Sequence, residues 1–96
     1  MSTIFAPINF PRKDPDAKLT YALDWSDWIP EGSVLQSFTT VVTGVTDLGQ
    51  QPISGNLTPI VIGGGTPGTI ATIEFHVITD TGLEDDRTAY LEVIER

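Results

Sequence analysis

Apolar and polar residues alternate strictly over residues 18–26. The apolar positions are all odd-numbered: Leu19, Tyr21, Leu23 and Trp25. A period of two indicates a β-strand with one buried and one solvated face. Similar alternation covers Ile70–Thr79 and the stretch 87–95, and no part of the chain has a helical repeat of ten or more residues. The sequence therefore predicts a domain made of β-strands.

Five to seven short strands, separated by turns rich in glycine and proline, account for most of the chain. The expected strands cover residues 18–25, 33–43, 57–62, 70–79 and 87–95. The expected turns cover residues 27–32, 63–68 and 80–84. This spacing favours an all-β fold, an immunoglobulin-like or fibronectin-III-like antiparallel β-sandwich. A small Greek-key barrel is the alternative, because periodicity does not fix the order of the strands.

The register of the strand over residues 33–43 is less regular than that of the others. Its apolar residues divide between two faces, with Val34, Phe38 and Val42 on one and Leu35 and Val41 on the other. A β-bulge would explain this division. The glycine-rich stretch 44–55 that follows predicts a hairpin or loop, with a short strand around Val45 or Ile53.

Residues 1–16 form an extended N-terminal arm in this interpretation, and residues 17–96 form the β-sandwich domain. Prolines recur in the arm at Pro7, Pro11 and Pro15, and each removes a backbone donor that a helix or a central strand would need. The arm also carries four large apolar residues: Ile4, Phe5, Ile8 and Phe10. These side chains need a surface to cover them, which is either the arm's own domain or a neighbouring subunit.

Length and charge restrict what the domain can bind. A chain of 96 residues without cysteine is one module that must be held together by packing, and it has no thiolate for zinc or catalysis. Its net charge of -8 disfavours nucleic acid and anionic membranes as partners. The arm is slightly basic and the domain acidic. We expect a protein made in the cytoplasm, because the sequence lacks a signal peptide and a long apolar segment.

Three groups of residues invite a functional interpretation and have a simpler one. The glycine-rich stretch 63–68 lacks the spacing of a phosphate-binding loop and is interpreted as a turn. His76, the single histidine, falls on the polar side of its strand, and no nucleophile or base can be assigned to it. The acidic residues around the turn at 80–86 do not match an EF-hand, so calcium binding there stays open. No catalytic residue, metal site or cofactor is predicted.

The aromatic residues and the carboxylates near them form the last candidate group: Tyr21, Trp25, Trp28 and Tyr90, with Asp24 and Asp27. Exposed aromatics beside carboxylates are common in carbohydrate-binding modules. The alternation places Tyr21 and Trp25 in the core, however, and leaves Trp28 as a possible contact residue. Asp24 and Asp27 are expected to accept turn hydrogen bonds, with Arg87 or Arg12 as possible ion partners.

Several short motifs, in order along residues 13–93, resemble a family of small tailed-bacteriophage proteins, the fibre-tail adaptors. They are Lys13-Asp14-Pro15-Asp16-Ala17-Lys18-Leu19, Asp24-Trp25-Ser26-Asp27-Trp28 with Gly32-Ser33, Gly63-Gly64 with Gly68, and Ile78-Thr79-Asp80-Thr81-Gly82 before Asp86-Arg87. The resemblance implies a virion structural protein with an immunoglobulin-like domain that joins the tail or baseplate to receptor-binding fibres.

On this interpretation the protein is not an enzyme and works through protein–protein contacts. The arm would supply the contacts to tail, baseplate or fibre proteins through Ile4, Phe5, Ile8, Phe10, Arg12 and Lys13. Several copies are expected in a symmetric assembly within the virion tail. A carbohydrate-binding β-sandwich module is the alternative, and it requires Trp28 and Tyr90 to be exposed together on one face. A small hydrolase, which would need a nucleophile and a base in contact, is the less favoured third class.

Overall fold

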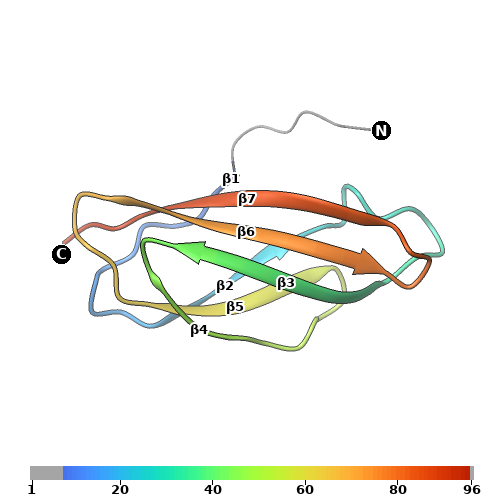
Figure 1. Cartoon of the computed structure of the whole chain (residues 1–96), viewed down its shortest axis with the longest axis horizontal. Helices are drawn as coiled ribbons and strands as arrows, with labels where there is room; N and C mark the ends of the chain where they lie inside the picture. The colour runs from blue at the N-terminus through green and yellow to red at the C-terminus, as the bar shows by residue number, and fades with distance from the viewer. Residues whose placement is uncertain (1–7, 96) are drawn as a thin grey trace.

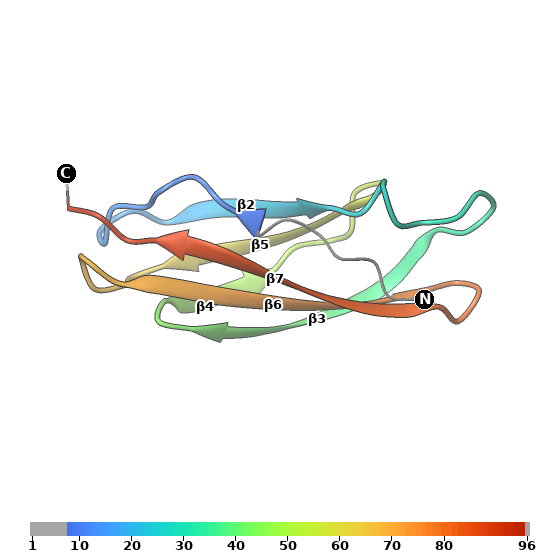
Figure 2. The same ribbon diagram turned by 90° about the horizontal axis from the view of Figure 1, so that it is seen from above.

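The computed structural model describes residues 8–95, which form seven β-strands and no helix (Figure 1). The strands are β1 (Ile8–Asn9), β2 (Leu19–Asp24), β3 (Leu35–Thr43), β4 (Thr46–Gln50), β5 (Leu57–Gly63), β6 (Ile70–Thr79) and β7 (Glu84–Glu92). They make a four-stranded sheet in the order β1-β7-β6-β3 and a three-stranded sheet in the order β2-β5-β4. Figure 2 shows the two sheets as stacked layers. The predicted all-β sandwich is confirmed, and its immunoglobulin-like type stays a prediction.

The core lies between the sheets and contains the residues of β2, β6 and β7 that the alternation assigned to it, together with residues of the apolar run in β5. Its members come from both layers and include Tyr21, Leu23, Trp25, Ile60, Ile62, Ala71, Ile73, Phe75, Val77, Ala89 and Leu91, all buried. Their polar neighbours along each strand face outward, because successive side chains of a strand point to opposite faces. In the part of the chain that is described, no helix is long and apolar enough to cross a membrane.

A bulge in β3 resolves its irregular pattern. The pairing of β3 with β6 shifts between Leu35 and Ser37, so that Leu35 is buried although Phe38 and Val42 also face the core. Val34, which the simple pattern placed beside Phe38, is exposed because it precedes the strand. The bulge expected from the sequence is confirmed.

β7 begins at Glu84, three residues before the start expected from its apolar alternation. The turn before it is closed by Thr79: the Leu83 N–H donates to Thr79 Oγ1 at 3.0 Å, and the Thr79 N–H donates to the Leu83 carbonyl at 2.8 Å. Gly82 adopts a φ of 87°, which supplies the positive φ predicted for it. The tight turn lets the acidic residues that follow pair with β6 instead of forming a loop.

Candidate partner-binding groove

The described part of the predicted arm lies along the edge of its own domain. β1 pairs in parallel with β7, with Ile8 beside Ala89 and Asn9 beside Tyr90. The Phe10 N–H donates to the Tyr90 carbonyl at 2.9 Å, which continues this pairing. Ile4 and Phe5 lie outside the described residues. The contacts of residues 8–10 thus place one end of the arm on the four-stranded sheet.

Ile8 and Phe10 are half-buried and pack against the core. The ring of Phe10 stacks on Tyr21 with 5.0 Å between ring centroids, and it meets the edge of Phe75 at 6.2 Å. Because Tyr21 belongs to β2 and Phe75 to β6, Phe10 closes the sandwich between the two sheets. Its buried part serves the fold, and only the remainder is available to a partner.

Lys13 has no accessible surface, although it was expected among the partner contacts. Its Nζ donates to the carbonyls of Gly64 at 2.6 Å and Asp14 at 2.7 Å, with the Pro15 carbonyl at 3.5 Å. Burial lowers the pKa of the Lys13 ammonium, and the carboxylates of Asp14 and Asp16 partly oppose that shift. The structure therefore gives Lys13 a role inside the domain.

The backbone of Lys13 adds a second connection. Its N–H donates to the Glu92 carbonyl at 3.0 Å, and its carbonyl accepts from the Ile94 N–H at 2.9 Å. The side chain of Lys13, through its hydrogen bond to the Gly64 carbonyl, also holds the glycine turn between β5 and β6. We call this arrangement the Lys13 clamp: it ties the N-terminal segment, the end of β7 and the glycine turn together.

The stretch 63–68 is the turn that the sequence predicted, and its glycines permit close packing. A β-carbon on Gly65 would come within 2.8 Å of Val93 and 3.1 Å of Val45. Gly65 also has a φ of 108°, which other residues rarely adopt. The turn can thus lie against the end of β7, where Lys13 holds it.

A groove of about 550 Å³ lies beside the segment that the Lys13 clamp fixes. Its lining comes from the N-terminal segment, β6 and β7: Asn9, Phe10, Arg12, Ile70, Tyr90 and Glu92. Ile70 is 67% exposed and Tyr90 39% exposed. Arg12 Nε and Glu92 Oε1 form a salt bridge of 2.9 Å beside them, and both side chains reach solvent. The groove offers apolar contacts next to paired charges, which suits one apolar side chain of a partner with polar groups around it.

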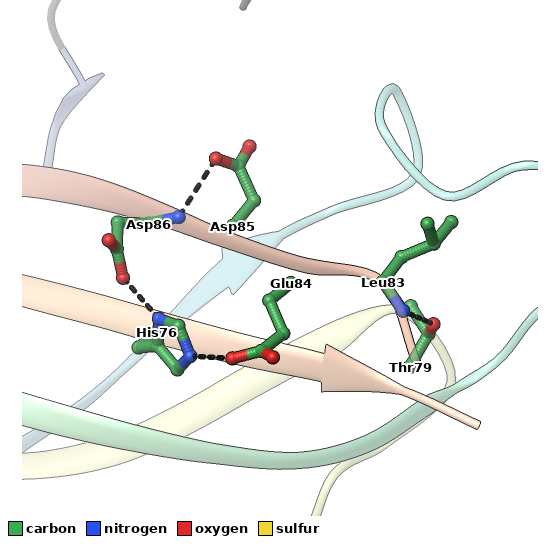
Figure 3. A network of polar contacts seen from close by, with 6 residues as sticks. All are labelled: His76, Thr79, Leu83, Glu84, Asp85 and Asp86. Atoms are coloured by element: carbon green, nitrogen blue, oxygen red, sulfur yellow. Dashed lines mark hydrogen bonds and ion pairs between the residues drawn. The ribbon is translucent and has the colours of Figure 1, made fainter. Parts of the chain in front are cut away.

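His76 lies on the outer face of the same sheet, away from the core. Its Nδ1 contacts Asp86, and its Nε2 lies 2.8 Å from Glu84 Oε1, as Figure 3 shows. These hydrogen bonds, with Asp86 first, raise the pKa of His76 above its ordinary value. Each ring nitrogen thus lies within hydrogen-bonding distance of a carboxylate on the neighbouring strand β7.

The acidic residues near this histidine do not gather around a common point. Among residues 8–95 no group of three or more histidine, cysteine, aspartate or glutamate side chains is placed to hold a metal ion. The Asp85 carboxylate instead accepts the Asp86 N–H at 2.9 Å.

The two tryptophans lie at one end of the core. Trp25 is fully buried, and its Nε1 donates to Thr58 Oγ1 at 3.1 Å. Trp28 is half-buried with its ring edge-on to Trp25 at 5.6 Å. Arg87 lies over the Trp25 ring and binds Asp27 at 2.9 Å, which is one of the ion pairs that the sequence allowed. Tyr90 belongs to the outer face instead, so Trp28 packs on the core while Tyr90 lines the groove.

Phe10 and Arg12 of the groove were among the expected arm contacts, and of the other four lining residues two could have been found from the sequence and two could not. Ile70 and Tyr90 are large apolar residues at positions that alternation assigns to the outside of β6 and β7, which is a sign of contact surface. Asn9 and Glu92 have no such sign. They join the groove because the N-terminal segment pairs with the distant β7, a pairing that periodicity does not reveal.

The matched family model agrees with the resemblance seen in the sequence. The model is described as podophage GP4 fiber-tail adaptor protein gp77, and it matches residues 13–92, which is most of the chain. No curated protein matches the chain. The matched span begins at Lys13 and ends at Glu92, so it includes Lys13, the glycine turn that its side chain holds and the acidic partner of Arg12. The chain therefore belongs to the podophage fibre-tail adaptor family.

Proposed function

We propose that this virion protein joins the phage tail to receptor-binding fibres by seating a segment of one partner in the groove beside β1. The observation that carries the proposal is the exposure of Ile70 and Tyr90 next to the Arg12–Glu92 salt bridge. Apolar anchors surrounded by polar groups are typical of protein–protein contacts. A structural, non-enzymatic role in the virion tail follows from the family.

The arm contributes to the same joint in this proposal. Ile8 and Phe10 fix the arm on the sandwich by packing, and Arg12 is exposed at the rim of the groove. Ile4 and Phe5 precede β1 in the sequence and supply further apolar contacts to the partner. Lys13 holds this arrangement without touching the partner. Trp28, half-buried at the far end of the core, stays a predicted contact.

Two exposed residues of the four-stranded sheet provide a matched test. Ile70→Ser removes an apolar group inside the groove, and Val41→Ser removes one outside it; the two residues are 67% and 63% exposed. We expect Ile70→Ser to weaken binding to the purified tail or fibre protein of the same virion about tenfold, and Val41→Ser to leave it within about twofold. Calorimetric titration measures both. Equal affinities for the two variants would show that the groove is not the joint.

A further inference from the structure

The outer face of the three-stranded sheet carries small and apolar side chains. Tyr21 and Leu23 of β2 and Ile60 and Ile62 of β5 are buried, so the residues between them point outward. We define the three-stranded face by four of these outward residues and by Leu48 of β4; the set is Thr20, Ala22, Pro59, Val61 and Leu48. Leu48 lies over Gly63, where an added β-carbon would meet Leu48 Cδ1 at 2.7 Å. The face therefore offers little charge and little bulk.

A charged residue lies at each end of this face, one basic and one acidic. Lys18 precedes β2 and lies beside Gly63 on the outer side of the sheet, since a β-carbon added to Gly63 would lie 3.6 Å from Lys18 Cγ. Asp24 closes β2, and its Oδ1 accepts the Ser26 N–H at 2.9 Å. The two are about 20 Å apart along an extended strand. Asp47 of β4 is directed elsewhere, toward Thr40 Oγ1 of the other sheet at 3.4 Å.

The opposite face of the sandwich is acidic. Its outward residues on β6 and β7 include four carboxylates: Glu74, Glu84, Asp86 and Glu92. The whole chain carries a net charge of -8, so two copies repel each other wherever these carboxylates meet. Of the two faces, only the three-stranded one lets two copies approach without that repulsion.

We propose that two copies of this chain pack against each other through their three-stranded faces. The arrangement is a two-fold one whose axis lies across the strands, so that the two β2 strands run in opposite directions. Lys18 of each copy then lies opposite Asp24 of the second copy, and the small residues between them pack sheet on sheet. The contact rests on the proposed function and deepens it, because it names a second copy as the partner of the face that the groove does not use.

Charge reversal tests the arrangement directly. In a dimer of Lys18→Glu, residues 18 and 24 that face each other are both acidic, and in a dimer of Asp24→Lys they are both basic. Each variant alone should therefore lose self-association. An equimolar mixture should regain self-association as a heterodimer of the two variants, because the acidic residues 18 and 24 of one chain then face the basic residues 24 and 18 of the other. Sedimentation equilibrium at chain concentrations up to about 1 mM reaches such weak complexes, with circular dichroism to show that each variant is folded. Folded variants whose mixture stays monomeric would overturn the pairing of Lys18 with Asp24.

Two threonines provide the matched control. Thr20 on the three-stranded face and Thr39 on β3 of the opposite face are both exposed, and Glu at either adds the same charge. We expect Thr20→Glu to weaken self-association at least tenfold and Thr39→Glu to change it by less than threefold. A wild-type chain that is monomeric throughout, or equal effects of the two substitutions, would overturn the proposal. No tail or fibre protein is present in this measurement, so its failure is separate from failure of the groove.

Discussion

The two outer faces of the sandwich share a backbone plan and differ in what their outward positions carry. The four-stranded face holds carboxylates, His76 and the groove, whereas the three-stranded face holds small neutral residues between Lys18 and Asp24. The inward positions of both sheets are mostly apolar, with Arg87 over the Trp25 ring as a buried exception. The core thus explains why the chain folds, and the outward positions are where the two faces differ. On the two proposals above, the groove takes a tail or fibre protein and the three-stranded face takes a second copy of the chain.

The largest effect is expected from a substitution of Lys13, because the Lys13 clamp attaches the N-terminal side of the groove to the four-stranded sheet. Lys13→Met keeps the length of the side chain and removes its three contacts with backbone carbonyls. We expect the free energy of unfolding to fall by about 3 kcal/mol, since partly buried carbonyls lose a charged donor. Urea denaturation followed by tryptophan fluorescence measures the change.

Lys18→Met is the control, five residues away on an exposed position, and both variants are measured at micromolar chain concentration so that self-association does not contribute. It should change the unfolding free energy by less than about 0.5 kcal/mol, as substitutions at exposed positions usually do. If the two variants were equally stable, the carbonyl contacts of Lys13 would contribute nothing, and the clamp would not be what holds β1 beside β7.

The fold was largely predictable because burial leaves a periodic mark on each strand. Ala71, Ile73, Phe75 and Val77 alternate without interruption, and β6 is accordingly a central strand with all four buried. The pattern was weaker where the backbone departs from regular geometry. The bulge at Leu35 still left a sign in the sequence, because it divides the apolar residues of β3 between two faces. The start of β7 at Glu84 left none, because it depends on the hydrogen bonds of Thr79 that shorten the turn.

The candidate site was less predictable, because it depends on contacts between distant segments. Lys13 looks like a surface residue in a polar stretch, and only its bond to the carbonyl of Gly64, 51 residues away, shows that it is interior. Arg12 was a possible partner of Asp24 or Asp27, and the structure pairs it with Glu92 because β1 runs beside β7. A charged residue in sequence has many possible partners, and the fold selects one.

Removal of residues 1–7 tests whether the arm contributes to partner binding at the groove and not to self-association through the three-stranded face. The truncation leaves β1, Phe10 and Lys13 in place, so we expect the unfolding free energy to change by less than about 1 kcal/mol. Binding to the tail or fibre protein should weaken about tenfold, because Ile4 and Phe5 are lost. Self-association should stay within about threefold of wild type. A truncated chain that binds the partner as tightly as the full chain would remove the arm from the joint.

The smallest effect concerns His76, which makes the four-stranded face sensitive to pH. Contacts with Asp86 and Glu84 raise the pKa of His76 in the folded state above its ordinary value of about 6.5. The folded protein therefore binds its proton more tightly than the unfolded chain does. The resulting stabilisation is complete below the ordinary pKa and is lost as the pH rises through the folded pKa. Unfolding free energies measured from pH 6 to pH 9 should accordingly decline.

His76→Gln keeps a polar side chain and removes the titration, so its unfolding free energy should stay level over the same range if His76 is the cause. The decline in the wild type should be shallow, because His76 and both carboxylates reach solvent, which screens their attraction. Added salt should flatten it further. A decline that persists unchanged in His76→Gln would assign the pH dependence to another group. In that case the four-stranded face would differ in charge from the three-stranded face through its carboxylates, which stay charged near neutral pH, and His76 would not make its stability depend on pH.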